Sequence, residues 1–240
     1  MKILTLDIEL TPIEAHVWQL YGNQNIGLHQ IREVPQMLCA AAKWYGENEI
    51  LWSRGPAFGG DLDMWWTLLD RADMVITWNG DKFDLPHLNR EFIQAGMAPP
   101  EPYISLDLLK TSRKAFLFPS NKLDYVAGKL LGAHKTPHTG HQLWIDCMAG
   151  DPVAWELMEK YNRRDVWLTE QLYPKFLPWI KAYPNARLMD DHEGCPRCGS
   201  PHLQKRGFRH TAVSTYQRFQ CQTCKSWLSD TKRLKATTIC

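Results

Sequence analysis

The chain of 240 residues carries 28 Lys and Arg against 26 Asp and Glu, so its formal net charge is only +2. Hydrophobic residues at 44% and charged residues at 22% are typical of a folded globular protein. The sequence lacks an apolar run of the ~20 residues that a membrane helix needs, and its N-terminus lacks the basic flank and apolar stretch of a signal peptide. We therefore expect a cytoplasmic protein with no membrane partner.

The first candidate for chemistry lies in residues 2–10, where dense Ile and Leu without Gly or Pro predict a buried β-strand. Strand side chains alternate between two faces, so Asp7 and Glu9 point the same way. Two neighbouring carboxylates on a core strand repel each other and lose hydration, and a divalent cation would compensate for that cost. The alternative is an edge strand whose polar face is simply in contact with water.

The remaining elements alternate between strands and helices. Strands at 37–42 and 50–52 follow the first strand with short joins, which predicts an antiparallel meander. Apolar runs and helical spacing then predict a helix at 61–71, a strand at 74–78, a helix ending near Gly96, a strand at 103–108 running into a helix, a helix at 123–131, a long helix from Asp151 to Tyr173 stopped by Pro174, a short helical segment to Tyr183 and a linker at 184–194. This order predicts an α/β fold, with a mixed sheet of a meander plus parallel strands flanked by helices.

Two further stretches place acids where the sheet and a helix could converge. Asp84 follows the fourth strand at a helix start, and Asp165 interrupts an apolar helix stripe that also carries Tyr161 one turn earlier. Each acid has a simpler explanation, because Asp84 could cap its helix and Asp165 could pair with a buried Arg. Their occurrence together with the acids of the first strand favours a metal site.

Three short motifs carry a family resemblance. Asp-Ile-Glu at 7–9, Asn-Gly-Asp-Lys-Phe-Asp at 79–84 and Tyr-Asn-Arg-Arg-Asp at 161–165 resemble, in order, the three exonuclease motifs of the DEDD 3′–5′ exonuclease superfamily. The most similar group is the proofreading domain of family-B DNA polymerases with its stand-alone bacterial and phage relatives, over residues 1–180. A Tyr four residues before the last Asp marks the tyrosine branch, since the histidine branch has His one position earlier, where this chain has Lys160.

The resemblance implies an RNase H-like fold and a site with two Mg²⁺ or Mn²⁺ ions. The implied ligands of these ions are Asp7, Glu9, Asp84 and Asp165. Hard cations prefer such oxygen ligands, and two of them ~4 Å apart neutralise the attacking and leaving oxygens of a phosphodiester. Tyr161 would orient the attacking water, and Asn79 and Phe83 would line the bound 3′ nucleotide. Asp107, at the end of the fifth strand, would be a supporting acid, with a helix cap or an ion pair as the alternatives.

Four of the seven Cys form two C-x-x-C pairs with 22 residues between them, namely Cys195 with Cys198 and Cys221 with Cys224. Four thiolates at this spacing predict one closed, structural Zn²⁺ site, whereas a redox pair lacks the βαβ surroundings that it would need. The segment looks like a zinc ribbon of the type seen in transposase and transcription-related proteins. The sequence leaves open the roles of the three other cysteines, Cys39, Cys147 and Cys240.

Charge is divided unevenly along the chain. Residues 195–240 hold nine Lys and Arg against one acid, a net +8, whereas the preceding residues carry −6. A basic tail with interleaved rings predicts contact with a single nucleic acid strand, although it could also be a solubilising end. Phe219 and Trp227 are expected to form the ribbon's own small core. We divide the chain into an exonuclease domain at 1–188 and a four-cysteine zinc-ribbon nucleic-acid-binding domain at 189–240.

The leading hypothesis is therefore a metal-dependent 3′–5′ exonuclease that hydrolyses phosphodiester bonds, with single-stranded DNA 3′ ends as the favoured substrate. One alternative keeps the same site but cuts internally, as an endonuclease. The other is a zinc-ribbon adaptor on an inert body, which the retention of all four acids argues against.

Overall fold

Five strands form the central mixed sheet, in the order β5-β4-β1-β6-β7. The computed structural model describes residues 1–19, 25–181, 183–188 and 193–238. The central strands are β1 (Ile3–Leu10), β4 (Met37–Trp44), β5 (Leu51–Arg54), β6 (Met74–Thr77) and β7 (Ile104–Asp107). β1, β4 and β5 are antiparallel neighbours, and β6 and β7 run parallel to β1. The predicted meander and mixed sheet are thus confirmed.

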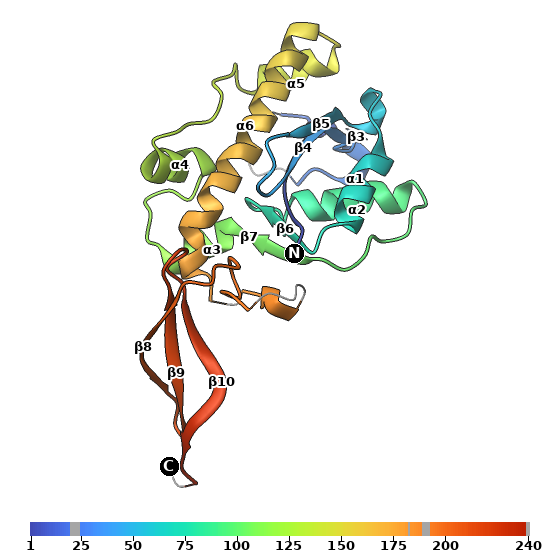
Figure 1. The fold of residues 1–240 in the computed structure, drawn as a ribbon. Helices are drawn as coiled ribbons and strands as arrows, with labels where there is room; N and C mark the ends of the chain where they lie inside the picture. The colour runs from blue at the N-terminus through green and yellow to red at the C-terminus, as the bar shows by residue number, and fades with distance from the viewer. Residues whose placement is uncertain (20–24, 182, 189–192, 239–240) are drawn as a thin grey trace.

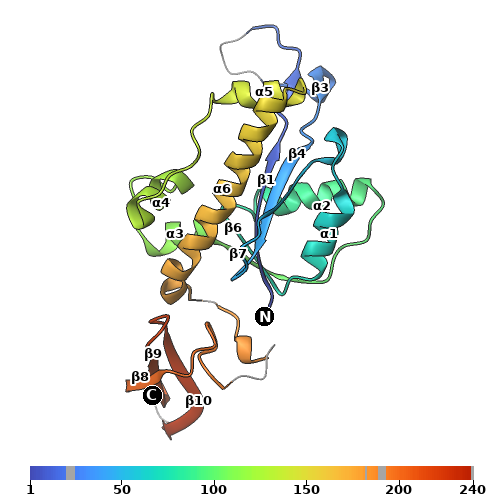
Figure 2. The ribbon, with the colours of Figure 1, turned by 45° about the horizontal axis from the view of Figure 1, so that its top comes forward.

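Helices cover both faces of this sheet (Figures 1 and 2). They are α1 (Leu62–Asp70), α2 (Asp84–Gln94), α3 (Leu108–Ala115), α4 (Leu123–Leu131), α5 (His141–Met148) and α6 (Pro152–Phe176). Leu4, Leu6 and Ile8 of β1 pack with α1 and α2, whereas Ile3 packs with α3, α4 and α6. Because strand side chains alternate, this arrangement turns Asp7 and Glu9 toward α6.

The long helix α6 crosses the sheet face diagonally (Figure 2). It begins as predicted, with the Asp151 side chain accepting a hydrogen bond from the Val153 N–H and Pro152 in the first turn. Its predicted end at Tyr173 is wrong, because the helix continues through Pro174 to Phe176. Proline removes one hydrogen bond close to the helix end, and the complete burial of the Phe176 ring in the core outweighs that loss.

Helix α5 was not predicted, because its eight residues are too few for a clear helical period. Its Leu143 and Cys147 pack against α6 and β4, in a cluster that also contains Cys39. Cys39 and Cys147 are therefore buried core thiols, and Cys240 lies outside the described residues. The remaining short elements are β2 (Glu14–Ala15), β3 (Ile31–Glu33) and the 3-10 turns η1 (Leu28–Gln30), η2 (Pro56–Phe58), η3 (Leu177–Trp179) and η4 (Ala186–Leu188).

The C-terminal part forms a separate three-stranded antiparallel sheet that projects from the end of α6 (Figure 1). Its strands are β8 (Leu203–His210), β9 (Ser214–Cys221) and β10 (Trp227–Ala236). At its base, Cys224 packs against the core around α6, and Arg197 Nη1 donates to the Leu177 carbonyl at 2.6 Å. The expectation that Trp227 lies in a ribbon core is wrong, since its side chain is 48% exposed.

The division at residue 188/189 stays a prediction, because residues 189–192 lie outside the described part of the chain. None of the helices in the described ranges is both long and apolar enough to cross a membrane. The cytoplasmic location stays a prediction as well.

Candidate metal-dependent active site

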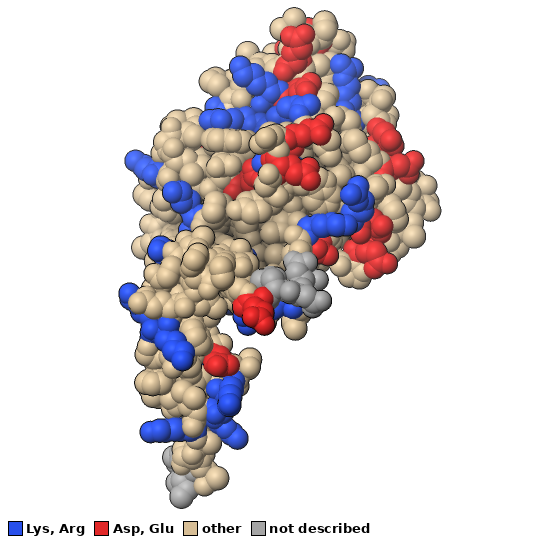
Figure 3. All heavy atoms as spheres, in the orientation of Figure 1, with Lys and Arg blue, Asp and Glu red and all other residues tan. Residues whose placement is uncertain are grey.

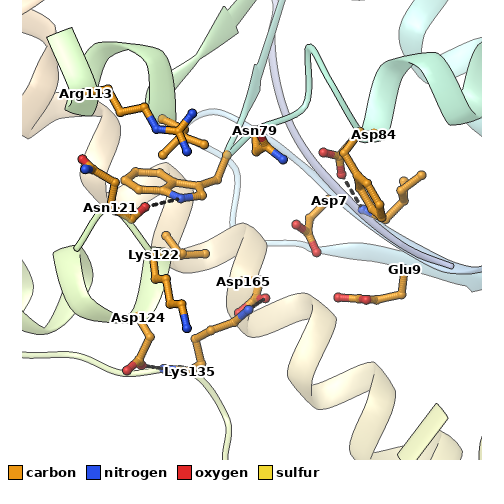
Figure 4. Close-up of a pocket in the computed structure, with 15 residues that line it drawn as sticks. Asp7, Glu9, Asn79, Asp84, Arg113, Asn121, Lys122, Asp124, Lys135 and Asp165 are labelled. Atoms are coloured by element: carbon orange, nitrogen blue, oxygen red, sulfur yellow. Dashed lines mark hydrogen bonds and ion pairs between the residues drawn. The ribbon is translucent and has the colours of Figure 1, made fainter. Parts of the chain in front are cut away.

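Three predicted acids meet between the sheet and its longest helix. Asp7 and Glu9 project from β1 toward Asp165 on α6, as Figure 4 shows. Carboxylate oxygens of these three residues lie within 4.8 Å of one another. Asp165 is almost fully buried, and Asp7 and Glu9 are half-buried. Asp7 and Glu9 therefore do not belong to an edge strand whose polar face is simply in contact with water.

The fourth predicted acid, Asp84, borders the same pocket but lies outside this close group. It is the first residue of α2, whose N-cap position is held by Phe83, so Asp84 is not the cap. Beyond Thr5 the strand β1 is no longer paired with β6, and the Asp84 Oδ1 accepts the Ile8 backbone N–H at 2.9 Å. The turn after β6 thus places a buried carboxylate beside the backbone that carries Asp7 and Glu9.

The electrostatics of the group favour a bound cation. Burial raises the pKa of Asp7 well above its ordinary value, and three neighbouring carboxylates raise it further. Burial and then the charge of Asp165 raise the pKa of Glu9 to about 8, and burial raises the pKa of Asp84 to about 7. Burial is the first cause of each shift, so these carboxylates are costly to keep charged where they lie, and a divalent cation would offset that cost.

One atom in the site points to the same conclusion. Asp165 Oδ1 is buried and, within the described part of the chain, has no hydrogen-bond partner. A buried carboxylate oxygen without a partner is costly, and a hard metal ion would satisfy it. The donor set of hard oxygens without Cys or His fits Mg²⁺ or Mn²⁺.

Lys135 is a functional candidate that the sequence analysis missed. Its Nζ forms an ion pair with Asp165 Oδ2 at 2.5 Å and donates to the Tyr161 hydroxyl at 2.6 Å. Burial alone would lower the pKa of Lys135, but the charge of Asp165 and the other carboxylates outweighs burial and raises it. The loop that carries Lys135 has no periodicity to signal its contacts, although its backbone N–H is fixed by Asp124 Oδ1 at 2.8 Å.

Tyr161 lies where the third motif places it, one turn before Asp165 on the buried face of α6. Its ring meets the rings of His138 and Trp144 edge-on, with centroids 4.8 and 5.9 Å away. Burial, followed by the charges of nearby carboxylates, raises the pKa of its phenol, so the hydroxyl stays protonated at neutral pH. A protonated hydroxyl can orient a water molecule but cannot act as a base.

Asn162 is a second residue that sequence reasoning missed. It is fully buried, and its Nδ2 donates to Asp7 Oδ2 at 2.7 Å and to the Asp7 backbone oxygen at 3.2 Å. The amide therefore fixes the direction of the Asp7 carboxylate. The sequence did contain one indication of this role, since Asn162 is a polar residue next to Tyr161 on the buried side of the helix.

The two residues predicted to line the nucleotide, Asn79 and Phe83, border the pocket. Asn79 has a φ of 79°, a backbone conformation that Asn tolerates better than most residues, and its N–H donates to Asp107 Oδ1 at 2.9 Å. The same oxygen accepts from the Leu109 N–H at 2.9 Å, so Asp107 caps α3. Of the roles left open for Asp107, the structure favours the helix cap.

The pocket has a volume of about 580 Å³ and opens to solvent. Opposite the acids it is bordered by the basic side chains of Arg113 and Lys122 (Figure 4). The Trp78 indole also borders it, held by a hydrogen bond from its Nε1 to the Asn121 carbonyl at 3.2 Å. A pocket that combines acids, cations and rings in this way can bind a phosphate-bearing ligand together with metal ions.

The four predicted zinc ligands also come together, at the base of the C-terminal sheet. Their sulfurs lie within 4.8 Å of one another, with Cys195 and Cys224 at 3.7 Å and Cys198 and Cys221 at 3.7 Å. Sulfurs around a tetrahedral Zn²⁺ with bonds of about 2.3 Å would be about 3.8 Å apart. The four thiols therefore fit one zinc ion, and the distances are too long for disulfides.

A family model described as the RNase_H superfamily matches residues 6–177. Among solved structures, the chain is similar to the family B DNA polymerase from the hyperthermophilic archaeon Pyrobaculum calidifontis, with a TM-score of 0.57 and 15% sequence identity. The match covers 88% of this chain and 31% of the polymerase chain, and at this identity it is a likeness of fold. No curated protein matches the sequence.

Proposed function

Because the chain belongs to the RNase H superfamily, which confirms the expected fold, we propose that it is a divalent-metal-dependent 3′–5′ exonuclease of the tyrosine branch of the DEDD superfamily. The proposed substrate is single-stranded nucleic acid with a free 3′ end, with DNA favoured over RNA. The observation that carries the proposal is the close group of the Asp7, Glu9 and Asp165 carboxylates, with Asp84 beside it.

The four carboxylates are the proposed ligands of two Mg²⁺ or Mn²⁺ ions, which supply charge neutralisation for phosphodiester hydrolysis when bound. Asn162 holds Asp7 in a single orientation, so this ligand needs little reorganisation on binding. Asp84 is held beside Ile8 by its hydrogen bond and borders the same pocket. These contacts preorganise the ligand set before a cation arrives.

Tyr161 is the proposed orienting group for the attacking water, since its protonated hydroxyl faces the acidic group. Lys135 fixes that hydroxyl and places a positive charge beside Asp165. We assign Lys135 a positioning role on this geometry. Asn79 and Phe83 are the proposed contacts of the terminal nucleotide, together with the rings and cations of the pocket.

The pocket, with a volume of about 580 Å³, is in the range of small-ligand sites, ~300–1,000 Å³, and can hold one or two nucleotides of a single strand. The C-terminal segment, 189–240, is the proposed zinc ribbon, with a structural Zn²⁺ on its four cysteines and a basic surface that holds the nucleic acid.

The direct test uses oligonucleotides of DNA and RNA, labelled at either the 5′ or the 3′ end, with zinc-loaded protein and Mn²⁺. Stepwise shortening from the 3′ end is the expected result. Internal fragments would instead support an endonuclease, and binding without cleavage would support a non-catalytic adaptor.

Variants connect this activity to the site. Asp7→Ala and Asp165→Ala should abolish cleavage while the circular dichroism spectrum remains that of a folded protein. Glu156→Ala is the matched control, because it removes an exposed acid from the same helix as Asp165. Full activity in either site variant would contradict the metal assignment.

A further inference from the structure

The C-terminal sheet has two chemically different faces, which its strand register defines. On one face, Arg209 of β8 and Arg233 of β10 both lie opposite Tyr216 of β9, in a row across the three strands. Further along β9, at every second residue, Arg218 lies opposite Ser229 of β10 and Gln220 lies opposite Trp227 of β10. Directly paired residues point to the same side of a sheet. We name this side the arginine face, made of Arg209, Tyr216, Arg218, Trp227 and Arg233.

The opposite face carries different residues. Lys205 and Leu228 flank Phe219 there, and Lys235 lies opposite Thr215. Phe219 is partly exposed, so its place in a ribbon core stays a prediction. This lysine face therefore carries two lysines in place of the arginines, together with the ring of Phe208, which lies opposite Gln217 and is 50% exposed. It serves as an internal comparison for the arginine face.

The arginine face is open to ligands. Arg209 and Arg233 are exposed, the Trp227 side chain is 48% exposed, and Tyr216 and Arg218 are partly exposed. The Arg218 guanidinium lies over the Trp227 ring, 5.6 Å from its centroid. Asp230 is the only acid in residues 195–240, so the arginines have little countercharge in this part of the chain. Figure 3 shows Lys and Arg spread along the projecting sheet.

We propose that the arginine face binds single-stranded nucleic acid, with bases stacked on Tyr216 and Trp227 and phosphates held by the three arginines. Guanidinium groups bind phosphate oxygens in pairs and stack on rings, which lysine cannot do. Exposed rings recognise unpaired bases, whose faces are hidden in a duplex. This inference extends the proposed function, because it assigns substrate binding by the ribbon to one face and one kind of strand.

The test compares the two faces at equal charge. Binding of a fluorescein-labelled single-stranded DNA 20-mer is measured by anisotropy with the zinc-loaded full chain and without Mg²⁺ or Mn²⁺, so the substrate stays intact. Arg209→Ala with Arg233→Ala should raise Kd about tenfold or more and reduce the slope of log Kd against log salt by ~1.4, since each phosphate that is no longer neutralised accounts for ~0.7. The matched control, Lys205→Ala with Lys235→Ala, should raise Kd by less than about threefold.

Ring variants test stacking. Trp227→Ala and Tyr216→Ala should each raise Kd for the single strand at least about fivefold, the lower end of the range for loss of one stacked base. Both should leave duplex binding nearly unchanged. A zinc content of one ion per chain shows that the C-terminal sheet of each variant keeps its zinc site. If a ring variant loses zinc, the comparison of the arginine pair with the lysine pair still tests the inference, because those four side chains are exposed.

Equal weakening by the arginine and lysine pairs would overturn the inference, as would equal affinity for single strands and duplexes. Failure of the proposed exonuclease is a separate result. A wild-type chain that shows these binding differences but does not cleave with Mn²⁺ would refute the nuclease proposal and support this one.

Discussion

Replacing Asp84 with Asn tests how much it costs the folded protein to keep a buried charge in the acidic site. Asp84 is 2% exposed, and burial raises its pKa from an ordinary 3.8 to about 7. The amide of Asn has nearly the same shape and keeps an oxygen that can accept the Ile8 N–H. The substitution therefore removes the charge with little change in packing.

The sign and size of the effect follow from proton binding. Because the pKa of Asp84 is higher in the folded than in the unfolded protein, the folded state holds this proton more tightly. The wild type therefore has its full free energy of unfolding below pH 4 and loses part of it as the pH rises to about 7. At 1.36 kcal/mol for each tenfold change in proton affinity, the full loss is about 4 kcal/mol. Neighbouring carboxyl groups can take up protons and relieve part of the repulsion, so we expect about 1–3 kcal/mol.

The assay is urea unfolding of zinc-loaded wild type and Asp84→Asn between pH 4 and pH 8.5, without Mg²⁺ or Mn²⁺. The variant should match the wild type near pH 4 and become progressively more stable than it up to pH 7, then keep a constant advantage. Adding Mg²⁺ at pH 8 should stabilise the wild type more than the variant, because ligand binding favours the folded state. Parallel stability curves across this pH range would refute the reasoning.

Three further predictions concern other residues. Tyr161→Phe should lower kcat about 10–100-fold, because the loss of a hydrogen bond to a charged group costs ~1.5–3 kcal/mol. The affinity for Mn²⁺, measured by calorimetry, should stay within about threefold of the wild type. An unchanged kcat would exclude the orienting role. Asn162→Ala should weaken Mn²⁺ binding about 10–100-fold by freeing the Asp7 carboxylate, and unaltered calorimetric affinity would show that the hydrogen bond does not preorganise it. Cys198→Ser should reduce zinc below one ion per chain and weaken nucleic acid binding, and full zinc content measured by atomic absorption would contradict the four-thiolate site.

Much of the site could be predicted because its signals are periodic. Strand alternation correctly placed Asp7 and Glu9 on one face, and the helical stripe correctly placed Asp165 with Tyr161. These periods depend only on local backbone geometry, so a single sequence carries them. The order of strands and helices similarly led to the mixed sheet that the structure shows.

The missed residues depend on contacts between distant parts of the chain. Lys135 reaches Tyr161 and Asp165 from an irregular loop, and Asn162 reaches Asp7 across 155 positions. Side-chain hydrogen bonds between distant parts of the chain produce no regular interval between residues that could be recognised in the sequence. The end of α6 was misplaced for a related reason, since the rule that Pro174 stops a helix is local, whereas the burial of Phe176 is tertiary.

Whether these acids form one site for two divalent ions can be seen by anomalous diffraction from crystals soaked with Mn²⁺ and a 3′-terminal oligonucleotide. We expect two manganese peaks, both bounded by the carboxylates of Asp7, Glu9, Asp84 and Asp165. A single peak, or manganese bound elsewhere with these carboxylates still facing Lys135, would contradict this expectation.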